Sequence, residues 1–392
     1  MDALGASAIP RSARPMDRDL LERALELAEL GRPGARPNPV VGAVLARADG
    51  SILATGHHVR RGAEHAERAC LADHPGEIPA DATLYVTLEP CSHHGRQPPC
   101  SDLIIARGVP RVVFASCDAN PDTCGRGPGQ LAGAGIVVER GPADLERRAL
   151  QQNAGFHSAH LRGRPYVTAK WAMTRNGRFA TGDPQRRWIT GDASREFVHY
   201  LRAGSGAIAC GIGTVLADDP LLTVRGPIAD RMAVPPLRVV FDRRLELPVA
   251  SNLVRTAAEV PVIVACDHDA PTAHELVLLE AGVEVFRLPP PEPGAPCLLA
   301  ATLRMLADRE VQDLLLESGP RLLAAFHDAE LIDSIAAFVA PFEAPATEPG
   351  LALDHPLVAR ALAVPGEPSG EDELHVALVH PAWNFPGAVP GK

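Results

Sequence analysis

The chain has no excess of positive charge and no long hydrophobic run. Its 392 residues include 38 Lys and Arg against 48 Asp and Glu, for a net charge of −10, and both signs are mixed along the sequence. This balance argues against a large interface with nucleic acid or an anionic membrane, although a few local cations would suffice for a small phosphorylated substrate. Because no run of about 18 apolar residues is present, we expect no transmembrane helix.

The N-terminus and the cysteines show no sign of a secreted protein. The first 16 residues lack the apolar core of a signal peptide, so we expect a disordered leader and a cytoplasmic protein. The eight cysteines are scattered through the chain, which favours reduced thiols over a disulfide framework.

Composition and length are those of packed domains. Hydrophobic residues make up 46% of the sequence, and the length suggests two domains. We expect a leader at 1–16, a first domain at 17–145, a linker at 146–165 and a second domain at 166–392, whose tail after residue 342 is hard to assign.

Hydrophobic periodicity in the first domain alternates between strands and helices. Strands are expected at 40–46, 52–56, 83–88, 111–116 and 136–140, and helices at 17–30, 64–73, 101–108 and 127–135. Asp49–Gly50, between the first two strands, indicates a hairpin turn. The alternation predicts a mostly parallel sheet covered on both faces.

The alternation restarts after the linker. Strands are expected at 166–173, 207–213, 236–242, 261–266, 283–288, 313–318 and 332–341, and helices at 194–204, 274–283, 298–311 and 320–331. This second series predicts another α/β domain.

One His and two Cys in the first domain have the character of zinc ligands. His65 opens a helix, and Cys91 and Cys100 follow downstream. Three such ligands suit zinc and leave a fourth position for water, which is the arrangement of a catalytic site. Glu67 lies two residues after the His, so it can lie near the metal without binding it and carry a proton between water and a leaving group. A purely structural zinc site would have no need of Glu67.

The pattern His-x-Glu followed by Pro-Cys and Cys is typical of zinc deaminases that act on bases. Eight residues, 92–99, separate the two cysteines here, where two are usual. The segments RPNPVVGAV, GHHVRRGAEHAE, VTLEPCSHHGRQPPC and DANPDTCGRG closely resemble the deaminase half of the bifunctional riboflavin-biosynthesis deaminase/reductase family. The resemblance extends from about residue 17 to residue 341.

Several other residues of the first domain take their interpretation from this resemblance. It places Asn38 and His58 in the deaminase pocket. His93 and His94 are interpreted as substrate-binding or loop residues, because three metal ligands are already present. Cys124 falls outside the pattern and is not assigned to zinc.

The second domain lacks a GxGxxG motif, and Gly211-x-Gly213 is better explained by tight strand packing. LESGPRLL (316–323) reads as a strand, a Gly-Pro turn and the start of a helix, where free backbone N–H groups could hold a phosphate. KWAMTRNGR, RWIT and YLRAGSGAIACGIGTVLADDP resemble the reductase half of the same family, a domain of the dihydrofolate-reductase type that uses NADPH.

The resemblance also implies ligand-binding positions in this domain. It places NADPH near Ala172, Trp188, Thr214, Asp218, Gly319, Pro320, Arg321 and Leu322, and substrate near Arg202, Leu222, Arg225 and Glu317. Arg202 and Arg225 could bind the substrate phosphate through charge-assisted hydrogen bonds, and Glu317 could hold a hydroxyl or an amine. Without the motif, each Arg would as readily be explained by a surface ion pair.

Three positions and the tail depart from the family pattern. Asn176 stands where the family usually has Asp, Gly206 also where it has Asp, and Arg186 where it has Ser. PFEAPATEPG follows Ala340 in place of the usual Gly-rich segment. These departures leave open whether the reductase half is active.

Together these observations predict an N-terminal cytidine-deaminase-like three-layer αβα domain and a C-terminal dihydrofolate-reductase-like α/β domain. The resemblance implies zinc-dependent deamination of 2,5-diamino-6-(5-phosphoribosylamino)pyrimidin-4-one, then NADPH-dependent reduction of the ribosyl to a ribityl group. A homo-oligomer, dimer or tetramer, is expected. One alternative is a deaminase with a degenerate reductase domain. Another is a nucleic-acid-editing deaminase, which the net charge of −10 disfavours.

Overall fold

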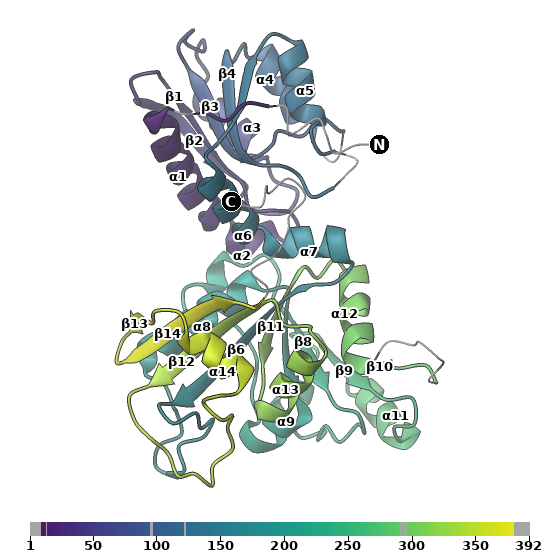
Figure 1. Ribbon diagram of the computed structural model, residues 1–392. Helices are drawn as coiled ribbons and strands as arrows, with labels where there is room; N and C mark the ends of the chain where they lie inside the picture. Colours follow the sequence, from purple (N-terminus) through teal and green to yellow (C-terminus); the bar gives the residue numbers. More distant parts are fainter. Residues whose placement is uncertain are drawn as a thin grey trace. The chain divides into compact units, whose positions relative to one another are not determined.

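The computed structural model describes residues 9–12, 14–94, 97–120, 123–290, 292 and 297–379. They fall into two compact units: the chain up to Arg162 belongs to one, and the other begins at Gly163 (Figure 1). Residues 1–8 and 13 of the expected leader lie outside the described residues. In its described part, the Ser12 amide donates to the Arg140 carbonyl at 2.8 Å, so this segment lies against the edge of the first sheet.

The first unit contains five strands and seven helices among the described residues. The strands are β1 (Gly42–Ala46), β2 (Ile52–His57), β3 (Thr83–Leu88), β4 (Arg111–Ser116) and β5 (Val137–Arg140). The helices are α1 (Pro15–Leu30), α2 (Arg32–Ala35), α3 (Ala66–Asp73), α4 (Cys100–Ala106), α5 (Arg126–Gly133), α6 (Ala143–Gln152) and α7 (Ala154–Arg162).

The sheet of the first unit has the order β2-β1-β3-β4-β5. The expected hairpin is confirmed, because β1 pairs antiparallel with β2 across the turn at Asp49–Gly50. The expected mostly parallel sheet is only half right: β1 is also antiparallel to β3, and only the β3–β4 and β4–β5 pairs are parallel. The tight hairpin explains the antiparallel β1–β2 pair, since parallel neighbours need a crossover connection.

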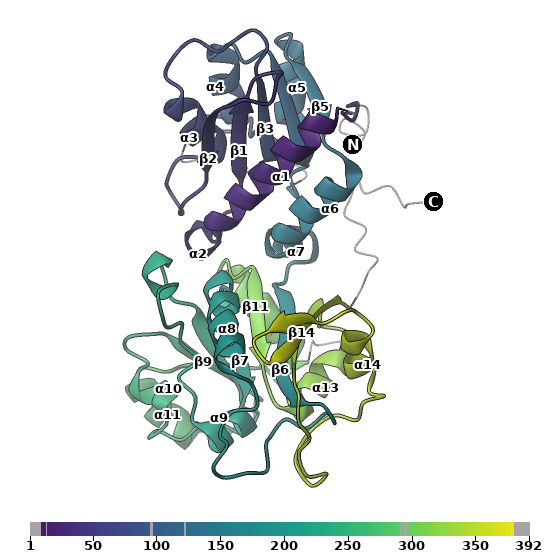
Figure 2. The same ribbon diagram turned by 90° about the vertical axis from the view of Figure 1, so that its left-hand side faces the viewer.

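Helices cover both faces of this sheet (Figure 2). Alternate residues of β1 serve the two layers: Val44 and Ala46 pack with α1 and α6, whereas Ala43 and Leu45 pack with α3, α4 and α5. All five residues of β1 are therefore buried, and the three-layer arrangement explains why this strand has no polar face.

Within the segment expected to form a linker (146–165), residues 146–152 belong to α6 and residues 154–162 to α7. Leu145 and Ala149 of α6 are fully buried in the core that α1 also lines. After α6, the Asn153 side chain accepts a hydrogen bond from the Val40 amide at 2.8 Å and donates one to the Val40 carbonyl at 3.0 Å. These contacts fasten the two helices to the first unit.

The second unit is built on nine strands among its described residues. They are β6 (Tyr166–Thr174), β7 (Ala207–Gly211), β8 (Leu237–Phe241), β9 (Val262–Cys266), β10 (Glu284–Arg287), β11 (Asp313–Glu317), β12 (Ser334–Ala340), β13 (Glu367–Ser369) and β14 (Asp372–Leu378). The helices are α8 (Asp192–Gly204), α9 (Ile212–Asp218), α10 (Asn252–Arg255), α11 (Thr272–Glu280), α12 (Leu298–Asp308), α13 (Pro320–Asp328) and α14 (Pro356–Leu362).

The order of this sheet is β10-β9-β8-β7-β11-β6-β12-β14-β13. Its strands are parallel from β10 to β12, and β14 and β13 add an antiparallel edge. The tail after residue 342, hard to assign from sequence, thus supplies α14 and these last two strands. Helices α12, α13 and α14 cover one face, and α8 to α11 cover the other. Within the described residues, no helix combines the length and apolar character needed to span a bilayer.

Candidate active sites

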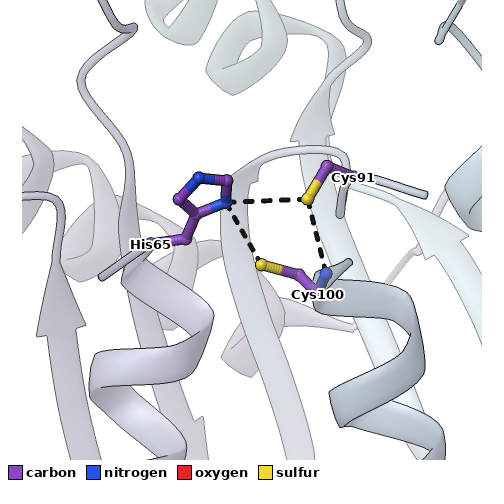
Figure 3. Close-up of side chains that lie close together, drawn as sticks. All are labelled: His65, Cys91 and Cys100. Carbon is purple, nitrogen blue, oxygen red and sulfur yellow. Dashed lines mark hydrogen bonds between the residues drawn. The ribbon is translucent and has the colours of Figure 1, made fainter. Parts of the chain in front are cut away.

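Three donor atoms converge at the expected metal site of the first unit (Figure 3). The Nδ1 atom of His65 lies 3.6 Å from the sulfur of Cys91 and 3.3 Å from the sulfur of Cys100. Tetrahedral zinc bound to one nitrogen and two sulfurs would separate a nitrogen from a sulfur by roughly 3.6 Å. The donor set and its spacing therefore fit zinc with little movement.

Local structure places each donor. His65 is the residue before the first turn of α3, and Cys100 is the first residue of α4. Cys91 follows β3, and its sulfur accepts a hydrogen bond from the Cys100 amide at 3.3 Å. A hydrogen bond from the neighbouring Cys100 thiol lowers the pKa of Cys91 despite burial. The N-terminus of α4 favours a thiolate at Cys100, whereas its hydrogen bond with Cys91 and burial raise the pKa of Cys100.

Glu67 lies in the first turn of α3 and is only 4% exposed. Burial raises the pKa of its carboxyl group to about 7, and the negative charge of Cys91 adds to this effect. A carboxyl group with a pKa near neutrality can both take up and release a proton. Its neighbours include Cys100 and His65, so it adjoins the donor atoms without being one of them.

Close backbone packing holds the loop that carries Cys91. A Cβ added at Gly127, in the first turn of α5, would lie 1.7 Å from the carbonyl oxygen of Pro90. The Gly125 amide also donates to the Glu89 carboxylate at 2.8 Å. The start of α5 is thus pressed against the residues that precede Cys91, which explains the need for glycine at position 127.

A pocket of about 370 Å³ opens beside the metal site, within the size range of small-molecule sites. The expected residues Asn38, His58, His65, Glu67 and Cys91 all line it. His93 lines it as well, and both His93 and His94 are exposed and lie outside the cluster of metal donors.

The pocket also contains residues that sequence reasoning missed, namely Arg61, Glu89, Asp118, Asn120, Phe156 and His160. Asp118 and Asn120 follow β4, which is parallel to β3. Their signal was available in the sequence, because the carboxyl ends of adjacent parallel strands meet at one edge of a sheet. Phe156 and His160 lie on α7, in the segment expected to be a linker.

Hydrogen bonds define the orientation of Asn38 and His58. The Nδ1 atom of His58 lies 2.9 Å from the Glu64 carbonyl oxygen, which can only accept. Burial lowers the pKa of His58, so the ring is neutral and its Nε2 atom is an acceptor. The Asn38 amide, 3.0 Å from Nε2, must therefore donate its NH₂ group there. Its carbonyl oxygen stays available to accept a hydrogen bond from a ligand.

In the second unit, Arg202 and Glu317 form a buried ion pair. The Nε and Nη2 atoms of Arg202 lie 2.6 and 3.0 Å from the two carboxylate oxygens of Glu317, and Nη1 donates to the Thr223 carbonyl at 2.9 Å. Lys170, which sequence reasoning missed as a site residue, lies 3.7 Å from the same carboxylate. It shares one face of β6 with Ala172, two residues on.

The expected NADPH residues fall into two groups. Helices α9 and α13 begin side by side: a Cβ at Gly319 would lie 4.0 Å from the Thr214 hydroxyl, and one at Gly211 would lie 3.3 Å from Leu322. Trp188 is instead 51% exposed, with the Arg187 guanidinium 5.0 Å from its ring.

The positive charge of Arg187 also acts on Asp218. Burial raises the pKa of the Asp218 carboxyl group, and Arg187 lowers it. Pro320 and Arg321 form the first turn of α13 next to Gly319. Among the described residues, no hydrogen bond joins Trp188 to the group around Thr214.

The expected substrate residues Leu222 and Arg225 lie in the segment after α9. Leu222 is buried and has a left-handed backbone with φ of 49°. The Arg225 amide donates to the ring of His199 on α8 at 3.2 Å. Among the described residues, the exposed Arg225 guanidinium has no hydrogen-bond or ion-pair partner, in contrast to that of Arg202.

Comparison with known proteins decides the family. Residues 15–116 match the model of the cytidine and deoxycytidylate deaminase zinc-binding region, and residues 165–343 match that of the RibD C-terminal domain. The chain is 39% identical to riboflavin biosynthesis protein RibD of Aquifex aeolicus over 84% of its own length and 88% of that protein. The chain belongs to the RibD family.

Other relatives agree. RibD of Escherichia coli strain K12 is 37% identical over 83% of this chain and 88% of that protein. Among solved structures, RibD of Acinetobacter baumannii has a TM-score of 0.77 and 33% identity, covering 93% of this chain and 98% of that one. The deaminase/reductase of Thermotoga maritima has a TM-score of 0.75 and 31% identity, with the same coverage.

Membership of the RibD family confirms the expected fold and activity. The N-terminal domain is cytidine-deaminase-like, and the C-terminal domain is of the dihydrofolate-reductase type. The protein is a bifunctional riboflavin-biosynthesis enzyme with hydrolase and oxidoreductase activities, and it uses Zn²⁺ and NADPH.

The departures from the RibD pattern are accommodated by local contacts. The Asn176 carbonyl oxygen accepts from the Thr174 hydroxyl at 2.6 Å, as an Asp would, and its NH₂ group donates to the Ala344 carbonyl at 2.8 Å. Arg186 stacks on the ring of Phe342 at 3.7 Å. At Gly206 a Cβ would lie 3.2 Å from Val311, so this site has little room for a larger side chain. The replacements therefore form part of a packed structure.

Proposed function

We propose that His65, Cys91 and Cys100 hold the zinc ion and that Glu67 is the catalytic proton carrier of the deaminase. The supporting observation is the buried Glu67 carboxyl group beside three convergent donors in a pocket of about 370 Å³. The substrate we assign is 2,5-diamino-6-(5-phosphoribosylamino)pyrimidin-4-one, whose 2-amino group is replaced by oxygen. The size of the pocket favours such a small molecule over a nucleic acid.

The residues of the pocket divide the work. Zinc, when bound, supplies Lewis-acid activation of water. Glu67 accepts a proton from the attacking water and delivers it to the departing amino group, for which a pKa of about 7 is well suited. Asn38 presents a carbonyl acceptor to an amino group of the ring, because His58 fixes its NH₂ group. Ammonia and the uracil derivative are the products.

The second unit reduces the ribosyl group of this product. NADPH supplies the hydride. We assign its binding to Ala172, Trp188, Thr214, Asp218 and the turn from Gly319 to Leu322. The adjacent starts of α9 and α13 support this assignment, since both present free backbone N–H groups to an anion.

The substrate of the second unit meets Glu317, Leu222 and Arg225 in this proposal. Glu317 is an ionised acceptor for a ribose hydroxyl. The sequence suggested that Arg202 and Arg225 both bind phosphate. Because all three nitrogens of Arg202 already have partners, we assign to Arg202 the positioning of Glu317 and leave the phosphate to Arg225.

Domain limits, compartment and assembly are further parts of the proposal. We propose a deaminase domain at 17–145 and a reductase domain from residue 166. The segment at 146–165 connects them along the chain, and its helix α6 packs in the core of the first unit. The free cysteines of the described chain support a reducing, cytoplasmic compartment. The homo-oligomer stays a prediction, which sedimentation of the purified protein would test.

One assay tests both halves. The diaminopyrimidine phosphate is supplied with and without NADPH, and ammonia release and NADPH absorbance are followed separately. We expect ammonia in both cases and NADPH oxidation only after deamination. Ammonia without NADPH oxidation would contradict the assignments in the second unit, and absence of ammonia would contradict those in the first.

A further inference from the structure

A second group of metal-ligand side chains adjoins the deaminase pocket, whose lining includes one of its members, Glu89. Glu89, Cys117 and Cys124 each offer a ligand atom, and these atoms lie within 4.8 Å of one another. They come from the ends of β3 and β4 and from the segment before α5. Nothing in the deaminase motif uses the two cysteines, and Cys124 falls outside that motif.

One oxygen of the Glu89 carboxylate is buried in this group without a hydrogen-bond partner among the described residues. Glu89 is only 5% exposed, and its Oε1 atom accepts a hydrogen bond from the Gly125 amide at 2.8 Å. Among the described residues its Oε2 atom is buried without any hydrogen-bond partner. A buried carboxylate oxygen without a partner is costly. Coordination of a cation would satisfy it.

The charges around the group also favour a bound cation. Asp118 adds another negative charge next to Glu89 and Cys124. Arg140 is the cation that acts on both thiols, but its guanidinium is paired with Glu146. Two sulfurs and a carboxylate oxygen therefore share a buried space with little compensating positive charge, which is an environment that attracts a divalent metal ion.

We propose that Glu89, Cys117 and Cys124 bind a second zinc ion, separate from the one held by His65, Cys91 and Cys100. Two thiolates and one carboxylate are a ligand set that zinc accepts, with water as a fourth ligand. Tetrahedral zinc would require ligand atoms roughly 3.5–3.8 Å apart. Cys117 is buried and fixed at the end of β4, whereas Cys124 is half-buried on a turn. The group can therefore contract mainly by movement of Cys124.

This second ion would stabilise the deaminase pocket. Glu89 lies two residues before the zinc ligand Cys91, and the chain between Cys117 and Cys124 carries Asp118 and Asn120 of the pocket lining. Binding would join the end of β3 to that loop. It would fix one wall of the pocket without contributing to the chemistry.

Metal content of the full chain tests the proposal. The protein is purified under reducing, anaerobic conditions, exposed to zinc, freed of loose metal by gel filtration and analysed by atomic emission. We expect two equivalents of zinc per chain in the wild type and one in Cys124→Ser or Cys117→Ser. Cys100→Ser removes a ligand of the first site and should also leave one. Cys297→Ser, at an exposed cysteine outside both groups, should keep two.

A second measurement has a wild-type arm that does not depend on variant folding. Cobalt(II) added to the wild-type protein should bind in two steps, each with thiolate-to-cobalt absorption, and Cys124→Ser should lose one step. One equivalent in the wild type with an unchanged value in Cys124→Ser would overturn the second site alone. If Cys100→Ser keeps two equivalents, the first site, and not the second, is wrongly assigned. A Cys117–Cys124 disulfide that persists under reduction would also overturn the proposal.

Discussion

The Arg202 guanidinium and the Glu317 carboxylate face each other across two parallel hydrogen bonds of 2.6 and 3.0 Å. Burial by itself would raise the pKa of Glu317, but the charges of Arg202 and Lys170 lower it to about 2. Glu317 is thus a carboxylate throughout the physiological range and can only accept hydrogen bonds. This restricts it to a hydroxyl or amine of the substrate and excludes direct contact with phosphate oxygens.

Replacing Arg202 with Lys should impair the reductase selectively. Lysine keeps the charge but cannot make both hydrogen bonds, so we expect NADPH oxidation to fall roughly tenfold or more while ammonia release is unchanged. The acid limb of the reductase pH profile should also move to higher pH, because Glu317 loses the Arg202 hydrogen bonds that help to lower its pKa. Arg309→Lys, at an exposed ion pair with Glu284, is the control. An unshifted pH profile would remove the positioning role of Arg202.

Glu67→Gln should separate metal binding from proton transfer. The amide has the same shape but cannot carry the proton, so deamination should fall by roughly 10²–10⁴-fold. Zinc at His65, Cys91 and Cys100 should be retained. Reduction of already deaminated substrate should be unaffected. Glu64→Gln, three residues earlier and exposed, should keep full ammonia release. Native-rate deamination by Glu67→Gln would refute our assignment of the proton carrier.

Gly127→Ala should displace the loop that carries Cys91. The new methyl group would lie 1.7 Å from the Pro90 carbonyl, so the loop must move, at a cost of about 1–3 kcal/mol in unfolding free energy. We expect weaker zinc retention against a chelator and slower deamination. Gly129→Ala is a matched control on the same helix, because its Cβ meets nothing within 4 Å. It should stabilise α5 by about 0.5–1 kcal/mol. Equal zinc retention in the two variants would show that the Pro90 contact is unimportant.

How much of the fold and the candidate sites could be predicted from the sequence depends on how far apart in the chain the interacting residues lie. Zinc ligands are a short list of residue types at typical spacings, so His65, Cys91 and Cys100 could be named as candidates from the sequence, and the structure brings their donor atoms together. Local hydrophobic periodicity likewise predicted most strands. The antiparallel placement of β1 beside β3 could not be predicted, because strand order depends on packing between distant segments.

Other features became visible only through three-dimensional proximity. The Arg202–Glu317 pair joins residues 115 positions apart, so each side chain alone suggested a different role. Glu89 and Cys117 carry no signal of their own until β3 and β4 bring them beside Cys124. In the segment expected to be a linker, α6 carries many charged residues, and its buried apolar residues pack with distant parts of the chain, namely α1 and β4.

His157 should make the stability of the first unit depend on pH. It lies on α7 and is only 2% exposed, and burial lowers the pKa of its ring to about 4, below the unfolded value of about 6.5. Because the folded state binds the proton less readily, its contribution is complete above pH 6.5 and is lost as the pH falls towards 4. The shift corresponds to up to about 3 kcal/mol.

Urea unfolding followed by circular dichroism, between pH 7.5 and 4, would measure this contribution. Carboxylates and the zinc site also titrate in this pH range. The informative quantity is therefore the difference in unfolding free energy between the wild type and His157→Gln. The variant should lose less unfolding free energy than the wild type below pH 6.5, because glutamine takes up no proton. His74→Gln, at a half-exposed histidine of the same unit, should follow the wild-type curve. Parallel curves for wild type and His157→Gln would mean that His157 is protonated equally in the folded and unfolded chain.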